Sequence, residues 1–84
     1  MNMEFDESEI DNSFRLCSGK TLKNLKDLKR YVKEMPDEVY NYHVTGDKND
    51  FAFWLKNCLE LGQLAKSLNG VKTKRNFIKK ILEA

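Results

Sequence analysis

The chain has 84 residues, of which 40% are hydrophobic, and a formal net charge of +2. A chain of this length supports one hydrophobic core, and this composition excludes disorder over most of the length. No apolar run approaches the roughly 20 residues that cross a bilayer, and the acidic start MNMEFDESEID differs from a secretion signal. We therefore expect a small cytoplasmic protein that has no membrane span.

Charge is strongly segregated along the sequence. Residues 1–14 contain five acidic residues and no basic one, whereas residues 15–35 and 63–84 are basic. Because residues 1–13 have few apolar anchors, we expect them to form a poorly ordered acidic tail that folds back onto the basic helices. Residues 14–84 then form a single small helical domain.

Two cysteines, Cys17 and Cys58, are separated by 40 residues and show no CxxC or Cys/His spacing. This pattern indicates neither a zinc site nor a disulfide framework. We expect two reduced thiols, as is usual in the cytosol.

A small β-hairpin is predicted for residues 14–22. Apolar and polar residues alternate in FRLC and KTL on either side of Ser18 and Gly19, a pair typical of a tight turn. Such a hairpin is marginal alone in water, so helices must cover its apolar face.

The first predicted helix begins at Asn24, a good N-cap with Asp27 three residues later. Its apolar stripe consists of Leu25, Leu28, Val32 and Met35, and its outer face carries Lys23, Lys26, Arg30 and Lys33. Pro36 ends this helix and opens a second one, in which Val39, Tyr40, His43 and Val44 share a face. We expect Gly46 to end the second helix with a positive φ.

Asn49 or Asp50 is expected to cap a third helix, in which Phe51, Trp54, Leu55 and Cys58 form the most regular apolar stripe in the chain. Gly62 is the predicted C-cap of this helix, and a short helix around Leu64 and Leu68 follows. Thr73 should cap a terminal helix whose Phe77, Ile78, Ile81 and Leu82 face inward. The predicted fold is mainly α, a compact bundle of four or five short helices preceded by the hairpin.

Residues 14–68 resemble a family of short archaeal and bacterial domains of unknown function. The resemblance rests on Ser18, Gly19, Leu22, Leu25, Leu28, Met35, Asp37 to Tyr40, His43, Val44, Asn49 to Ala52, Trp54, Leu64 and Ala65. The Asn-Asp-Phe-Ala-x-Trp motif at 49–54, after His-Val, is the most specific part. Family members often carry Asp or Gly-Asp where this chain has ELGQ at 60–63, so that turn is expected to differ. The resemblance implies a compact domain and no known activity.

No catalytic, cofactor or metal site is recognisable. His43, the only histidine, lies near Asp47 and Asp50, but Phe51 and Ala52 occupy positions where an EF-hand needs an oxygen ligand and a glycine. The sequence also lacks a nucleophile motif and a phosphate-binding glycine loop. We expect no enzyme activity and no small-molecule substrate. For His43 we expect a hydrogen bond to the loop or to a helix cap, with a partner-binding role as the alternative.

Phe53 is the clearest candidate for a binding residue. It falls on the polar side of its helix beside Lys56, Asn57 and Glu60, so either another segment covers it or it contacts a partner. The leading hypothesis is an interaction module that binds another protein or its own copy.

The alternative is an accessory nucleic-acid or ribosome-associated protein that uses two basic helices. Clustered cations bind phosphates through counterion release, although such clusters are also common on solvated helix faces. The candidate residues are Lys26, Arg30, Lys33, Lys74, Arg75, Lys79 and Lys80.

Overall fold

A two-stranded hairpin and five helices make up the described part of the chain, residues 13–84, in a computed structural model. The elements are β2 (Phe14–Arg15), β3 (Thr21–Leu22), α2 (Leu25–Tyr31), α3 (Asp37–His43), α4 (Asp50–Asn57), α5 (Gly62–Leu68) and α6 (Lys74–Glu83). The mainly helical fold class and the hairpin are confirmed. The predicted acidic tail lies outside the described residues, apart from Ser13.

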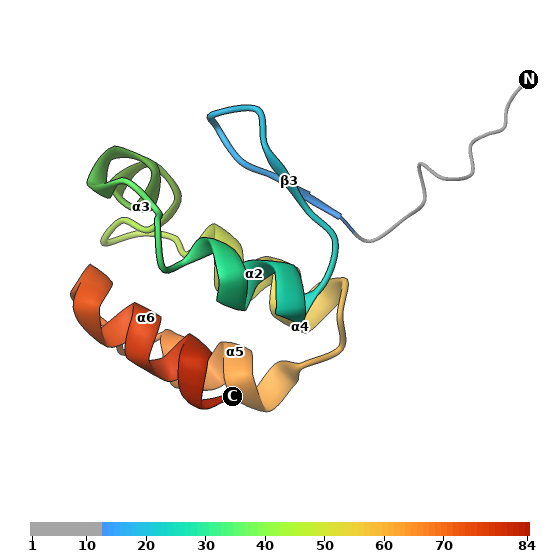
Figure 1. Cartoon of the computed structure of the whole chain (residues 1–84). Coiled ribbons are helices and arrows are strands. Elements are labelled where there is room, and N and C mark those ends of the chain that lie inside the picture. The colour runs from blue at the N-terminus through green and yellow to red at the C-terminus, as the bar shows by residue number, and fades with distance from the viewer. Residues whose placement is uncertain (1–12) are drawn as a thin grey trace, which may run out of the picture.

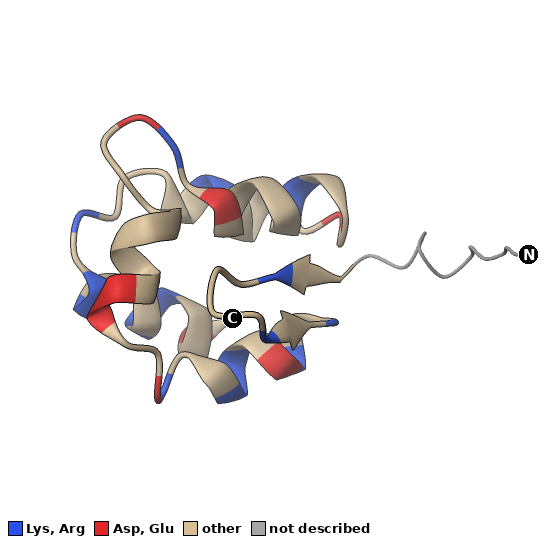
Figure 2. Cartoon of the chain, turned by 90° about the horizontal axis from the view of Figure 1, so that it is seen from above, with Lys and Arg blue, Asp and Glu red and all other residues tan. Residues whose placement is uncertain are grey.

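Four of the helices pack in two layers (Figure 1). Helix α2 lies alongside α6 in one layer, and α4 lies alongside α5 in the other. The hairpin and α3 lie together at one end of these layers, above α2 and α4 in Figure 1. Seen from that end, the hairpin lies between α2 and α4 (Figure 2). The α2–α6 face and the α4–α5 face are therefore on opposite sides of the molecule.

The core lies between the two layers and draws on every element. Its largest fully buried side chains are Phe51, Phe77, Leu16, Leu22, Leu28, Met35, Leu55, Leu68, Ile81 and Val32. Phe51 of α4 is central, because its ring lies 5.1 Å from the rings of both Phe14 and Phe77, measured between centroids. Burial of such aromatic and aliphatic side chains provides the main driving force for folding.

The hairpin turns at the predicted place. Phe14 pairs with Leu22 and Arg15 with Thr21, and Gly19 adopts a φ of +100° in the turn. Glycine suits this position because it has no Cβ to clash in the left-handed region. Buried Leu16 and Leu22 then anchor the hairpin on the helices, which confirms that the helices cover its apolar side.

Three predicted N-caps are present. The side chains of Asn24, Asn49 and Thr73 accept hydrogen bonds from the backbone N–H groups of Asp27, Ala52 and Asn76, at 2.9, 3.0 and 3.1 Å. Each bond satisfies a donor that has no partner within its helix. The alternative between Asn49 and Asp50 is settled, because Asn49 is the cap and Asp50 is the first helical residue.

The prediction for Gly62 is wrong, since this residue begins α5 instead of ending α4. Helix α4 ends earlier, at Asn57, and the chain reverses at Glu60, whose φ is 58°. The Leu61 N–H donates to the carbonyl oxygen of Leu55 at 2.8 Å, which satisfies a carbonyl at the end of α4. A non-glycine residue thus occupies the left-handed position for which glycine was expected.

The positive φ predicted for Gly46 is also wrong. Val44 is already extended and pairs with Asn49 across the loop. Thr45 closes this loop, because its N–H donates to Lys48 O at 2.8 Å and its Oγ1 accepts from the Asp47 and Lys48 N–H groups. The tight loop is present, but a threonine side chain stabilises it instead of a glycine cap.

Two further expectations fail at the helix surfaces. Leu82 was expected to face inward, yet it is 41% exposed, because Phe77 and Ile81 occupy the buried side of α6. Lys33 was placed on the first helix, but α2 ends at Tyr31 and Lys33 lies in the following turn. No helix within residues 13–84 is long and apolar enough to cross a membrane.

Phe51 and Phe53 offer a matched test of this packing, since they lie on the same helix and are 0% and 69% exposed. Phe51→Ala should lower the free energy of unfolding by about 3–5 kcal/mol, because it leaves a cavity in the core. Phe53→Ala should change it by no more than about 0.5 kcal/mol. Urea denaturation followed by circular dichroism measures both, and similar losses for the two variants would contradict the assignment of the core.

Candidate functional site

Phe53 is the most exposed large hydrophobic residue among those described, at 69%. Its neighbours on α4 explain why: Phe51, Ala52, Trp54 and Leu55 turn toward the core and the adjoining helix. The hydrophobic stripe is thus complete without Phe53, and no described segment covers its ring. Of the two alternatives derived from the sequence, the exposed aromatic is the one observed.

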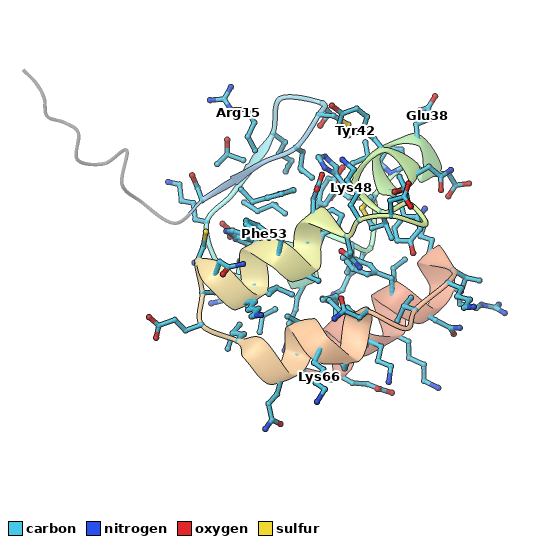
Figure 3. All side chains as sticks on the ribbon, turned by 180° about the vertical axis from the view of Figure 1, so that it is seen from behind. Arg15, Glu38, Tyr42, Lys48, Phe53 and Lys66 are labelled. Atoms are coloured by element: carbon cyan, nitrogen blue, oxygen red, sulfur yellow. The ribbon has the colours of Figure 1, made fainter. Side chains whose placement is uncertain are left out.

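An open groove adjoins Phe53 between α4 and α5, which run side by side in the foreground of Figure 3. Its volume is about 610 Å³, and its lining consists of Asn49, Ala52, Phe53, Lys56, Asn57, Gly62, Ala65, Lys66 and Asn69. Ala52 and Ala65 are buried between the two helices, so the floor of the groove is made of small side chains. Short side chains at facing positions leave room that larger ones would fill.

The groove is electropositive. Lys56 lies on its α4 side and Lys66 on its α5 side, and no carboxylate is among the described residues that line it. Neither lysine forms an ion pair within residues 13–84. The groove therefore combines an exposed aromatic ring with two available cations, which suits an apolar side chain accompanied by negative charge.

His43 lies at the junction of three elements. It is 4% exposed, at the end of α3, and its ring packs against the rings of Phe14, Tyr42 and Phe51 with centroid separations of 5.1, 4.9 and 5.4 Å. Its Nε2 accepts a hydrogen bond from the Cys17 N–H at 3.1 Å. An Nε2 that accepts must be unprotonated, so Nδ1 carries the hydrogen in the neutral ring.

The Nδ1–H of His43 donates to Asp50 Oδ2 at 2.8 Å, and Lys48 Nζ lies 3.1 Å from the same oxygen. Burial of Asp50 raises its pKa, but the hydrogen bonds from His43 and Lys48 and the charge of Lys48 outweigh this and hold the pKa below its ordinary value. Asp50 is therefore an ionised acceptor that joins α3 and its loop to the start of α4.

Both ring nitrogens of His43 are thus engaged inside the protein. A hydrogen bond to the loop or to a helix cap was expected, but the partner is Asp50, the first residue of α4, and the cap is Asn49. The additional bond to the hairpin was not foreseen. Asp47 takes part in the loop, where its N–H donates to Thr45 Oγ1. Within residues 13–84, no group of three or more His, Cys, Asp or Glu side chains could hold a metal ion. Partner binding by His43 stays a prediction, which this geometry does not support.

The basic candidates lie mainly on α2 and α6, two helices that adjoin one another (Figure 1). Lys26, Arg30, Lys33, Arg75, Lys79 and Lys80 are exposed, and Lys74 is half-buried. Two of the candidates face carboxylates: Lys74 Nζ is 2.9 Å from Asp37, and Arg30 is 3.8 Å from Asp27. The two helices adjoin, but Arg30 borders the hairpin, whereas Lys79 and Lys80 border Ser67 of α5.

Tyr42 is a second exposed aromatic, which the sequence pattern was not used to predict. Tyr42 is 60% exposed, and Lys48 Nζ lies 5.1 Å from the centroid of its ring (labelled in Figure 3). Its position off the stripe formed by Val39, Tyr40 and His43 could have revealed it. The lining residues of the α5 side of the groove were also missed, because only the packing of α5 on α4 assembles them.

Comparisons of the chain with protein-family models, with curated proteins and with solved structures find no match. The family resemblance of residues 14–68 therefore stays a prediction. Functional interpretation rests on the geometry of the chain itself.

Replacing Asp50 by Ala should lower the free energy of unfolding by about 1–3 kcal/mol, because the buried Nδ1–H of His43 loses its acceptor. Asp50→Asn retains an acceptor oxygen and should cost less. Because the folded pKa of Asp50 lies below its unfolded value, its contribution is complete above about pH 4 and is lost as the pH falls through the folded pKa.

Denaturant unfolding at several pH values tests this linkage. The difference in stability between the wild type and Asp50→Asn should shrink as the pH falls below about 4. Asp47→Asn is the matched control, since Asp47 is exposed and lies in the same loop region. An equal pH dependence for both variants would show that the Asp50 contact makes no special contribution.

Proposed function

We propose that this chain is a small helical interaction module that binds a protein partner, or a second copy of itself, through the α4–α5 groove. The observation that carries this proposal is the 69% exposure of Phe53 at the edge of that groove. A solvent-exposed phenylalanine gains about 1.5–3 kcal/mol when it is fully buried. Aromatic anchors in a desolvated groove commonly provide a large share of binding energy.

The position of Phe53 supports a binding role more strongly than a folding role. The core of α4 is completed by Phe51, Trp54 and Leu55, and Asn57 Nδ2 donates to the Phe53 carbonyl at 3.0 Å, which holds the backbone of this turn. The ring of Phe53 is thus presented by a rigid helix. Binding residues on rigid elements lose less conformational entropy than residues on mobile loops.

We also propose that the protein has no catalytic function and acts in the cytoplasm. The first point is supported by His43, whose ring nitrogens are both committed to structural hydrogen bonds and so are not available to a substrate. The second is supported by the free thiols of Cys17 and Cys58.

Nucleic-acid binding is a second candidate function, favoured by the adjacency of α2 and α6. Both helices carry exposed cations, among them Lys26, Arg30, Lys79 and Lys80. Such a surface would bind phosphates without sequence specificity. It ranks second because Asp27 and Asp37 already pair with two of the cationic side chains.

Phe53→Ala should weaken capture of the partner, or self-association, by at least about ten-fold, equivalent to about 1.4 kcal/mol. The helical circular-dichroism spectrum should not change, because Phe53 does not belong to the core. Tyr42→Ala is the matched control, as it removes an aromatic of similar exposure outside the groove. Elution volume in size-exclusion chromatography and partner capture that are both unaffected by Phe53→Ala would refute the proposal.

The second candidate is tested by retention on heparin or RNA in a salt gradient. If α2 and α6 bind phosphates, replacing Lys26, Arg30, Lys79 and Lys80 by Glu should abolish retention. Replacement of Lys56 and Lys66 by Glu, on the opposite face, should reduce it much less. A wild-type chain that is not retained even at low salt would eliminate nucleic-acid binding.

A further inference from the structure

We propose that the acidic segment of residues 1–12 binds in the α4–α5 groove of its own molecule. This inference rests on the proposed function in using the same groove, and it names the chemistry that the groove accepts: an acidic peptide with apolar anchors. Three observations carry it, namely complementary charge, a suitable apolar content and the point at which the segment joins the fold.

The charges of the segment and the groove are opposite. Residues 1–12 contain five carboxylates and no basic side chain. The groove presents Lys56 and Lys66, which have no carboxylate partner within the described part of the chain. Ion pairs at an exposed site contribute little singly, but complementary fields favour one binding site over others.

The segment also carries the apolar side chains Phe5 and Ile10. Within the groove, the Phe53 ring and the small side chains of Ala52 and Ala65 offer apolar surface that these two side chains could contact. A peptide with charge alone would gain little here, and a peptide with apolar residues alone would leave the two lysines unmatched. The combination of both in residues 1–12 matches the composition of the groove.

The attachment point places the segment next to α4. Phe14, which begins β2, packs on that helix, with its ring 5.1 Å from Phe51 and 5.5 Å from Trp54 between centroids. Twelve residues can span about 40 Å when extended, whereas the eight residues of α4 extend for about 12 Å. The groove on the side of α4 is therefore well within reach, and the short connection raises the effective concentration of the segment there.

The sequence alone favoured the basic helices as the site for this acidic segment. The structure points instead to the groove, because the groove combines two lysines with the exposed ring of Phe53, whereas the described residues of α2 and α6 include no exposed aromatic side chain. Occupation of the groove by residues 1–12 would compete with an external partner. The segment would then lower partner affinity, and a partner would displace it with a segment of similar chemistry.

Nuclear magnetic resonance of the uniformly ¹⁵N-labelled full chain tests the inference. The variant carries five replacements of carboxylates by amides: Glu4→Gln, Asp6→Asn, Glu7→Gln, Glu9→Gln and Asp11→Asn. Relative to the wild type, the backbone amide signals of Ala52, Phe53, Lys56, Ala65 and Lys66 should shift. Phe5→Ala should shift the same signals by the loss of an apolar anchor. Glu38→Gln, a matched amide replacement on α3, should affect only its own surroundings.

Three results would overturn the inference. The groove signals could be the same in all variants, or the shifts could fall on α2 and α6 instead. The shifts could also disappear on dilution, which would assign the bound segment to another molecule.

Partner capture is a separate readout. If Phe53→Ala loses capture while the groove signals are unchanged in the segment variants, the proposed function is retained and the inference is refuted. Shifts at the groove without any Phe53-dependent capture would support the inference and refute the proposed function.

Discussion

The hydrogen bonds of the buried His43 side chain are the constraint on which the rest of the structure depends. One ring nitrogen accepts from the backbone of Cys17 in the hairpin, and the other donates to Asp50 at the first turn of α4. Loss of either partner would leave a buried polar group unpaired, at a cost of about 1–3 kcal/mol. This residue at the end of α3 therefore joins three elements, and it fixes where α4 begins.

The start of α4 in turn decides which side chains point inward. With Asn49 as the cap, Phe51 enters the core and Phe53 is directed to solvent beside α5. A shift of this helix start by one residue would rotate the stripe by about 100° and would bury a different set. The exposure of Phe53 is thus a consequence of where α4 begins. The groove beside it lies on the side of the molecule opposite α2 and α6, so each face can be altered without touching the other.

Much of the fold follows from local rules in the sequence, because periodic apolar residues and N-caps act over three or four positions. Those rules failed at Gly62, where the left-handed turn is carried by Glu60 instead. The place of Phe53 on the polar side of its helix could be deduced, but not whether another segment covers its ring. The two partners of His43 could not both be deduced, because Cys17 is 26 residues away and is brought near only by tertiary packing. The groove has the same origin, as its two sides come from different helices.

The most direct test of the two His43 hydrogen bonds is the tautomeric state of this residue, measured by long-range ¹H–¹⁵N correlation of its ring nitrogens at neutral pH. The structure predicts a neutral ring with the hydrogen on Nδ1 and an unprotonated Nε2, since Nε2 accepts from the Cys17 N–H. Asp50→Ala should alter the Nδ1 signal. An Nε2–H tautomer, or a rapidly exchanging mixture of the two tautomers as in an exposed imidazole, would contradict the account of His43 as the structural centre of this fold.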